Sequence, residues 1–506
     1  MRRDNNRGHA GPTSLKSAAV SGAKWTTVST GFTAVIQFLQ VTVLAWWLKP
    51  SDFGLMAMSM LVLNFAEICL DFGMSKAIIH RQDTSREQLS SLYWVNVFVG
   101  WVLFAASFAA TPLVVIMFRE PRLYHLVPLV SALFLIGPIG AQFALLLQKE
   151  LRFRSLAVVE IVGSLMGALA AIGAAIAGLG VYALVLAQLA GSIVSTAILT
   201  MIGLRHWRPM FHFRRADLKG YMGFGLYQMG ERTLNFLYSR TDQLLIGMFV
   251  GPIALGYYSF SWNLIIQPMN RVNPTLTKVA FPLFARMQNE EERLRRGYLT
   301  LIRILATINA PILLGFAAIA PVLIPIVYGV QWTAAVPLIQ PLAVVGLLRC
   351  IMHPLGTLLL AKGRADLGFI WTLGVVGVNV AGVMISLHLG GLISIAYCLV
   401  LLHILYLLAM YTFVIRRLLG PCFSLYMGSL IPALAAAGVM VACVWFLPGL
   451  LPVGSKMLVA GQVAIGAIVY GAISILLQWP WLSEMAILFG VRTPFPRASP
   501  RIPPST

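Results

Sequence analysis

Polar and charged residues follow one face of the helix expected over residues 221–250. Gln228, Arg232, Asn235, Ser239 and Asp242 are separated by four, three, four and three positions. A helix turns by about 100° per residue, so this spacing places the five side chains on one face. Arginine stays charged and offers a planar fork of donors that fits phosphate or carboxylate. The stripe therefore predicts a site for an anionic group.

Further candidate contacts occur in other apolar stretches. Arg271 and Arg349 carry the same guanidinium chemistry, and Gln267 and Asn270 belong to a polar face beside Arg271. Amides also hydrogen-bond between membrane helices, so for the amides packing and cavity lining both stay open. An arginine in hydrocarbon is more costly, which weakens the packing alternative for the guanidinium groups. The predicted substrate contacts are Arg232, Arg271, Arg349, Asn235, Gln228, Gln267, Asn270 and Gln37.

Two acids are candidates for ion coupling, Asp242 and Glu67. An acid in a partly dry site can carry a proton, but both acids could instead neutralise neighbouring arginines. Arg240 lies about 80° from the stripe and nearer the outer surface, so an ion pair or extension toward water is as compatible with its position as ligand contact. His353, on the helix of Arg349, fits either a titrating group or an interior hydrogen-bonded histidine.

The sequence contains no motif of a familiar catalytic or metal site. We find no Walker loop, no HExxH, no GxSxG and no cluster of His, Asp and Glu in an outer connection. We therefore expect a protein that is not an enzyme and that binds no cofactor or metal.

The elements that must position these residues are membrane helices. The chain has 506 residues, of which 59% are hydrophobic and 11% charged, which is typical of an all-α membrane protein. About 20 apolar residues span the hydrocarbon as a helix. On that basis we predict about fourteen helices, at 25–48, 53–75, 90–118, 123–147, 155–177, 180–202, 221–250, 254–284, 298–328, 333–361, 367–389, 391–415, 425–447 and 457–479.

The basic residues predict the orientation. With the N-terminus inside, most of the 37 Lys and Arg fall in cytoplasmic segments, and outer segments hold Lys49, Arg119, Arg122 and Lys456. This asymmetry follows the positive-inside rule, and both termini are then cytoplasmic. The net charge of +20 is thus explained by topology. Nucleic-acid binding is not expected, because the charges are spread over many short segments without a recognition module.

The two halves of the chain resemble each other. Pro50 and Gly54 match Pro252 and Gly256 at an offset of 202 residues, and the polar stripe of residues 221–250 matches one on the first helix. Matched helices run in the same direction, which predicts parallel six-helix repeats. The predicted segments are 1–24 as a basic cytoplasmic N-terminus, 25–202 as the first lobe, 203–220 as a basic connector, 221–417 as the second lobe, 418–480 as two extra helices and 481–506 as a Pro-rich disordered tail.

Several motifs in order resemble the polysaccharide transporters, the Wzx-type flippases and colanic acid exporters of the multidrug/oligosaccharidyl-lipid/polysaccharide flippase superfamily. They are LKPSDFGLMAM (48–58), LDFGMSKAIIHR (70–81), LLQKELRFRSLAVVE (146–160), RTDQLLIGMFVGPIALGYYSF (240–260) and the stretch 274–298 with FPLFARMQNEEERLRRGY.

The resemblance implies a V-shaped pair of lobes in the bacterial inner membrane, with alternating access driven by an H⁺ or Na⁺ gradient. It implies a cargo of oligosaccharide repeat units on undecaprenyl pyrophosphate for exopolysaccharide, capsule or lipopolysaccharide synthesis. A polysaccharide polymerase and glycosyltransferases are the implied partners. Asp242, Gly247, Pro252 and Gly256 carry over as motif positions.

Three other functions stay open. A lipid II flippase would carry a peptidoglycan precursor with a similar head group. A multidrug antiporter would be expected to place acids, rather than arginines, in its cavity. A membrane-embedded polymerase or ligase would need a sizeable outer loop with reactive groups, whereas the expected outer connections are only a few residues long.

Overall fold

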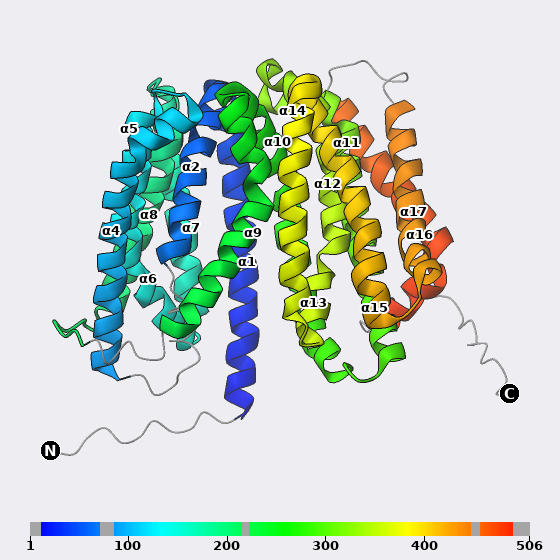
Figure 1. Cartoon of the computed structure of the whole chain (residues 1–506), viewed down its shortest axis with the longest axis horizontal. Coiled ribbons are helices and arrows are strands. Elements are labelled where there is room, and N and C mark those ends of the chain that lie inside the picture. The colour runs from blue at the N-terminus through cyan, green and yellow to red at the C-terminus, as the bar shows by residue number, and fades with distance from the viewer. Residues whose placement is uncertain (1–11, 71–84, 215–221, 447–455, 489–506) are drawn as a thin grey trace. The chain divides into compact units, whose positions relative to one another are not determined.

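The structure, a computed structural model, describes residues 12–70, 85–214, 222–446 and 456–488, apart from the side chains of some residues within helices. Every regular element in these ranges is helical (Figure 1). Through Phe249 the helices are α1 (Pro12–Trp47), α2 (Pro50–Leu70), α4 (Arg86–Phe118), α5 (Leu123–Ser131), α6 (Leu133–Lys149), α7 (Phe153–Ile176), α8 (Tyr182–Gly203) and α9 (Met222–Phe249).

The helices that follow range from 4 to 46 residues in length. They are α10 (Pro252–Arg286), α11 (Glu291–Tyr328), the 3₁₀ turn η2 (Val330–Ala335), α12 (Val336–Met352), α13 (Pro354–Ala361), α14 (Ala365–Met410), the π-turn η3 (Tyr411–Ile415), α15 (Arg416–Leu419), α16 (Phe423–Phe446) and α17 (Lys456–Leu488). The all-helical prediction is therefore confirmed for the described residues.

Eleven stretches of the described residues are long and apolar enough to cross a membrane. Helices α9 and α10 are not among them, because both carry several charged and amide side chains. One stretch, Asp366–Leu419, has 54 residues and contains a break at Gly390 and Gly391. Gly391 has a φ of 74°, which a residue with a side chain rarely adopts. This break coincides with the predicted boundary between the helices at 367–389 and 391–415.

Local signals explain where key helices begin. At α4 the Ser85 hydroxyl accepts a hydrogen bond from the Gln88 amide at 3.1 Å, and the Gln88 side chain accepts one from the Ser85 amide at 3.2 Å. This capping box satisfies two backbone donors that the helix leaves open. Helix α10 begins at Pro252, directly after Gly251 with a φ of 101°. Proline suits the first helical position because that position needs no amide donor.

Internal contacts divide the chain into two compact units. The first comprises Met1–Phe260 and Thr372–Leu392, and the second comprises Ser261–Trp371 and Ile393–Thr506. The contact boundary thus lies beyond the predicted connector at 203–220, because α9 packs against α2 within the first unit. The predicted lobes were defined by a sequence repeat, whereas the two units are defined by internal contacts. The limits of the lobes therefore stay a prediction.

In the first unit, small side chains allow helices α1, α7 and α8 to pack closely. A buried cluster joins Leu44 of α1 and Leu48, directly after α1, with alanines of α7 and α8, namely Ala171, Ala174, Ala175, Ala183 and Ala187. Membrane helices associate largely through van der Waals contact, so small residues at the interface strengthen it.

The two turns that match in sequence also contact each other. A Cβ atom on Gly54 would lie 1.7 Å from the carbonyl oxygen of Pro252, and one on Gly256 would lie 1.9 Å from the carbonyl oxygen of Pro50. The contact is reciprocal, and it requires glycine at both positions because backbone occupies the space of a side chain. All four residues belong to the first unit.

Helices extend into both predicted terminal segments, and only the prediction of disorder at 481–488 differs from the structure. Helix α1 begins at Pro12, inside the predicted N-terminal segment 1–24, and α17 continues to Leu488, inside the predicted disordered tail 481–506. Residues 481–488 contain mainly apolar and helix-forming side chains, and the prolines of the tail occur only later. The rest of that tail, 489–506, and residues 1–11 lie outside the described residues.

Candidate functional site

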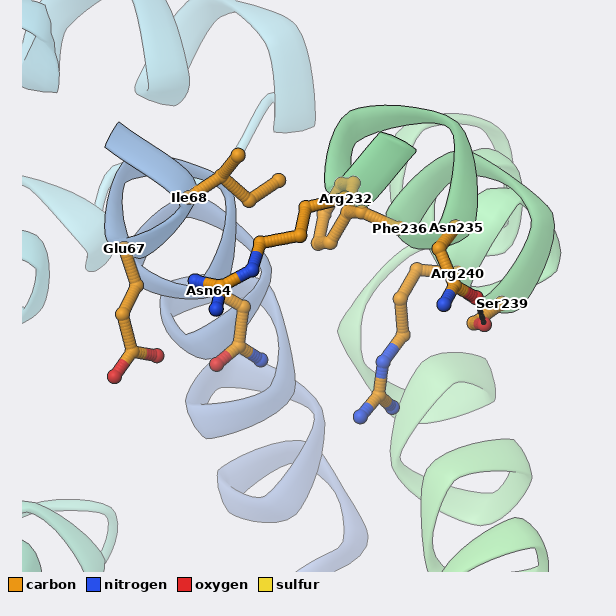
Figure 2. A pocket seen from close by; sticks show the side chains of 8 residues that line it. All are labelled: Asn64, Glu67, Ile68, Arg232, Asn235, Phe236, Ser239 and Arg240. Atoms are coloured by element: carbon orange, nitrogen blue, oxygen red, sulfur yellow. Dashed lines mark hydrogen bonds between the residues drawn. The ribbon is translucent and has the colours of Figure 1, made fainter. Parts of the chain in front are cut away.

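A polar pocket of about 510 Å³ opens between α2 and α9 within the first unit (Figure 2). Its lining combines two guanidinium groups, one carboxyl group, two amides, one hydroxyl and two apolar side chains. The lining residues are Asn64, Glu67 and Ile68 from α2, and Arg232, Asn235, Phe236, Ser239 and Arg240 from α9.

The spacing of the lining residues explains why they meet. On α2 they recur at intervals of three and one, and on α9 at intervals of three, one, three and one. Such intervals place side chains on one face of a helix. Next to the pocket the Phe65 and Phe236 rings lie with centroids 5.6 Å apart, which is an apolar contact between the two helices.

The two arginines reach the pocket from the same helix. Figure 2 shows Arg232 extending from α9 toward α2, with its guanidinium group beside Asn64. Arg240 points into the space between the helices, and its Nη1 donates a hydrogen bond to Gln243 Oε1 at 3.1 Å. Both side chains are half-buried, so a ligand in the pocket would have access to them.

The remaining polar groups complete a mixed site with an excess of positive charge. Glu67 supplies the only carboxylate among the lining residues, against two arginines. Asn64 and Asn235 each offer a donor and an acceptor, and the Ser239 hydroxyl donates to Asn235 Oδ1 at 3.4 Å. Charged groups at the depth of a membrane helix must face water or a polar ligand, because hydrocarbon leaves them unsolvated. The arrangement is therefore suited to hold an anion that also bears hydroxyl groups.

Asp242 lies on α9 but does not line the pocket. Its side chain is only 5% exposed, and its two carboxylate oxygens accept hydrogen bonds from the Tyr258 hydroxyl and from the Gln243 amide. Tyr258 is also fully buried. These bonds hold Asp242 between α9 and α10 within the first unit, and its role in ion coupling stays a prediction.

Arg349 is part of a separate polar cluster in the second unit. Its Nε–H donates to His403 Nε2 at 3.0 Å, and its guanidinium carbon lies 4.6 Å from the centroid of the Trp262 ring. The His403 Nδ1 atom lies 2.7 Å from the Leu399 carbonyl oxygen. The imidazole therefore donates from Nδ1 and accepts at Nε2, which is the neutral tautomer. These two contacts orient the Arg349 guanidinium without neutralising it.

The other predicted contacts are distributed over both units. Gln37 is exposed on α1, while Gln267 is half-buried and Asn270 exposed on α10 in the second unit. Gln228 lies on α9 and Arg271 on α10, and their side chains are outside the described residues. Of the predicted residues, the pocket thus brings together Arg232, Asn235 and Glu67.

Three residues of these sites are not among the predicted substrate contacts. The sequence leaves ligand contact, an ion pair and extension toward water all open for Arg240, which lines the pocket because a long side chain reaches beyond its own face. Asn64 was overlooked, although a polar pair at positions 64 and 67 of an apolar helix is a usable signal. His403 lies 54 positions from Arg349, and no spacing rule connects them. The histidine that the sequence singles out, His353, is exposed.

Comparison with known proteins places the chain among proteins of polysaccharide synthesis. A family model described as "Polysaccharide biosynthesis protein" matches residues 43–337. The chain is 34% identical to the teichuronic acid biosynthesis protein TuaB of Bacillus subtilis, over 90% of this chain and 95% of that protein. It is 31% identical to the lipopolysaccharide biosynthesis protein WzxC of Escherichia coli, over 82% of this chain and 85% of that protein.

Solved structures share the fold at low sequence identity. The lipid II flippase MurJ in an inward closed conformation matches with a TM-score of 0.71 and 12% identity, covering 90% of this chain and 99% of that one. An inward-facing multidrug transporter of the MOP superfamily matches with a TM-score of 0.59 and 15% identity, covering 76% and 94%. The fold is therefore that of MOP-superfamily transporters, as the sequence motifs predicted.

Proposed function

Because the chain belongs to the family of polysaccharide biosynthesis proteins, we propose that it is a flippase that moves a lipid-linked, anionic oligosaccharide across the bacterial inner membrane. The cationic pocket between α2 and α9 is the observation that carries this proposal. A membrane protein that only packed its helices would have no reason to place two arginines around an accessible cavity.

The pocket suits the head group of such a cargo. Its volume falls within the range of small-ligand sites, about 300–1,000 Å³. Arg232 and Arg240 would contact the phosphate oxygens or the carboxylate of an acidic sugar, because guanidinium binds such groups through paired hydrogen bonds. Asn64, Asn235 and Ser239 would contact sugar hydroxyls. We propose undecaprenyl pyrophosphate as the carrier lipid, on the resemblance alone.

The finer topology is part of the proposal. We propose fourteen spans in two six-helix lobes and a final pair. Helices α9 and α10 would cross the membrane despite their polar faces, and Asp366–Leu419 would cross twice. The reciprocal contact of the matched turns at Gly54 and Gly256 supports the repeat. Both termini would be cytoplasmic, in keeping with the positive-inside rule.

Transport would be driven by H⁺ or Na⁺, with Glu67 or Asp242 as the coupling group. Glu67 is exposed in the pocket beside the arginines, so binding of an anion would change its surroundings directly. Asp242 is buried and hydrogen-bonded, so it would respond only if α9 and α10 moved relative to each other. Glu67 is therefore the first residue to test.

A lipid II flippase is the main alternative, because its cargo also presents a pyrophosphate and sugars. The pocket fits both cargoes. A multidrug antiporter is less well supported, because the lining has more cations than acids. We also propose that the protein is not a polymerase or another enzyme, and that it acts beside a polysaccharide polymerase and glycosyltransferases.

The test is deletion of the gene followed by chemical analysis of the lipid-linked intermediate that accumulates. Complementation with Arg232→Ala, Arg240→Ala or Arg271→Ala should restore little or no export while the protein still inserts. Loss of a charged hydrogen bond costs about 1.5–3 kcal/mol, which corresponds to roughly tenfold weaker binding or more. Arg232→Lys should be intermediate, because lysine keeps the charge but not the fork.

Arg293→Ala is the matched control, because Arg293 is 70% exposed and paired with Glu290 outside the pocket. This variant should export normally. Normal polysaccharide output from Arg232→Ala and Arg240→Ala would refute the anionic pocket. Accumulation of a peptidoglycan precursor after deletion would select the lipid II alternative.

A further inference from the structure

The segment Leu204–Arg214, which follows α8, runs along the first turns of α4. Trp94 Nε1 donates to the Met210 carbonyl oxygen at 2.9 Å, and the Met210 amide donates to Ser90 Oγ at 3.1 Å. Ser91 Oγ accepts from the Arg214 amide at 3.3 Å. Side chains of α4 thus hold this backbone in place, although the segment belongs to no helix.

The two faces of this segment differ. On the inner face, Trp207 is buried, with its ring 6.0 Å from that of Tyr93 and 5.9 Å from that of Phe143. On the outer face, Phe211 stacks on Trp94 with centroids 5.0 Å apart and an interplanar angle of 19°.

The outer face is nevertheless open and apolar. Phe211 is 95% exposed, Phe213 56% and Met210 43%. The stacking on Trp94 holds Phe211 in position but covers little of it. A contiguous apolar patch of this kind usually marks a contact with a partner or with lipid.

The position of the segment along α4 favours lipid. Helix α4 has 33 residues, so it is roughly 50 Å long and exceeds the hydrocarbon thickness of about 30 Å. The residues of α4 that contact the segment are Ser90 to Trp94. Measured along the helix axis, they lie about 6 Å to 12 Å from its first residue. Figure 1 shows α4 at the edge of the first unit. The segment therefore lies beside a membrane span at the level of the lipid head groups.

The charges of the segment complement an anionic surface. Arg205, Arg208 and Arg214 are all exposed. Arg152, at the start of α7, contacts His206 at 2.5 Å and adds a further cation. Acids at this end include Glu87 and Glu150, so among these residues the positive charges are in excess. Aromatic and basic side chains together are typical of the interface between water and hydrocarbon.

We propose that Leu204–Arg214 is an interfacial anchor that binds anionic phospholipids of the cytoplasmic leaflet. Met210, Phe211 and Phe213 enter the boundary between head groups and acyl chains, and the three arginines contact lipid phosphates. Lipid is the occupant because the patch continues the lipid-facing side of a span. Three apolar side chains are also too few for a stable protein interface.

Depth measurement is the first test. A bimane fluorophore on Phe211→Cys, in protein reconstituted in vesicles, should be quenched by lipids with a nitroxide near the head group and poorly by aqueous iodide. Wild-type protein measures labelling of the native cysteines. Phe213→Cys is the second probe if Phe211→Cys does not fold, and Val330→Cys, 79% exposed, is a control at another site. Strong iodide quenching without lipid quenching at both 211 and 213 would overturn the proposal.

Lipid specificity is the second test. Native mass spectrometry of the purified full chain should show phosphatidylglycerol bound in preference to phosphatidylethanolamine. The triple variant Arg205→Gln, Arg208→Gln, Arg214→Gln should bind phosphatidylglycerol more weakly, by about fivefold per arginine. The control, Arg293→Gln with Arg296→Gln, removes exposed arginines that pair with acids and should change nothing. Equal phosphatidylglycerol binding by the triple variant would overturn the role of the arginines. If the fluorophore at residue 211 were protected from iodide quenching only when cytoplasmic protein is added, the patch would bind a protein partner instead of lipid.

Discussion

At the level of single residues, the structure gives the predicted contact Arg349 two partners that the sequence did not indicate. His403 accepts a hydrogen bond from the Arg349 guanidinium, and the Trp262 ring makes a cation–π contact with the same group. Both supporting side chains are almost completely buried. An arginine held in this way keeps its charge and loses much of its freedom, which is the arrangement expected of a preorganised contact for an anion.

His403→Phe should lower the stability of the protein by about 1.5–3 kcal/mol, because Arg349 then loses its buried acceptor. His403→Gln should keep most of the stability, since its side chain retains an acceptor oxygen. Thermal unfolding of the purified protein in detergent measures both. His388→Ala is the control, because His388 is exposed on α14. If His403→Phe and His388→Ala unfolded at the wild-type temperature, the hydrogen bond to Arg349 would have no structural role.

At the level of helices, the contact between the first turns of α2 and α10 is the one in the first unit that leaves least room for a side chain. Helix propensity alone favours alanine over glycine at Gly54 and Gly256. The contact reverses this preference, because a methyl group at either position meets a backbone carbonyl that cannot rotate away. Pairs of helices that approach so closely depend on the absence of a side chain.

Gly54→Ala and Gly256→Ala should each destabilise the protein by about 1–3 kcal/mol, as expected for overpacking. The measurement is thermal unfolding in detergent, together with export. Gly173→Ala on α7 is the matched control, because nothing lies within 4 Å of its added methyl group. That variant should be neutral or slightly stabilised. If both Gly54→Ala and Gly256→Ala had wild-type stability, α2 and α10 would be able to move apart without a loss of stability.

At the scale of the whole molecule, charge distribution predicts the orientation. Lys49→Cys and Val330→Cys should react with a membrane-impermeant maleimide in intact spheroplasts. Glu291→Cys should react only after permeabilisation. Its end of α11 carries the exposed arginines that pair with Glu290 and Glu292, and the positive-inside rule places such a basic end in the cytoplasm. Wild-type protein treated in the same way gives the background labelling of the native cysteines. If Glu291→Cys alone were labelled in intact spheroplasts, the topology would be the opposite of the one proposed.

Sequence patterns predict the helical class, the membrane class and the family. Apolar length identifies a helix that must satisfy its own backbone in lipid, so most of the predicted stretches coincide with helices. The bounds are less well predicted: α1 begins at Pro12 rather than 25, α17 ends at Leu488 rather than 479, and the predicted helix 123–147 is divided into α5 and α6. The 3.6-residue period also selected the face of α9 that bears Arg232 and Asn235. Ordered motifs predicted the family that the comparisons show.

Which helices share a site becomes known from the three-dimensional structure alone. The pairing of α2 with α9 brings Asn64 and Glu67 to Arg232 and Arg240, and no local pattern specifies a neighbour about 170 positions away. Arg349 and His403 meet for the same kind of reason. Periodicity describes a single helix, whereas the choice of partner depends on how complete helix surfaces fit together.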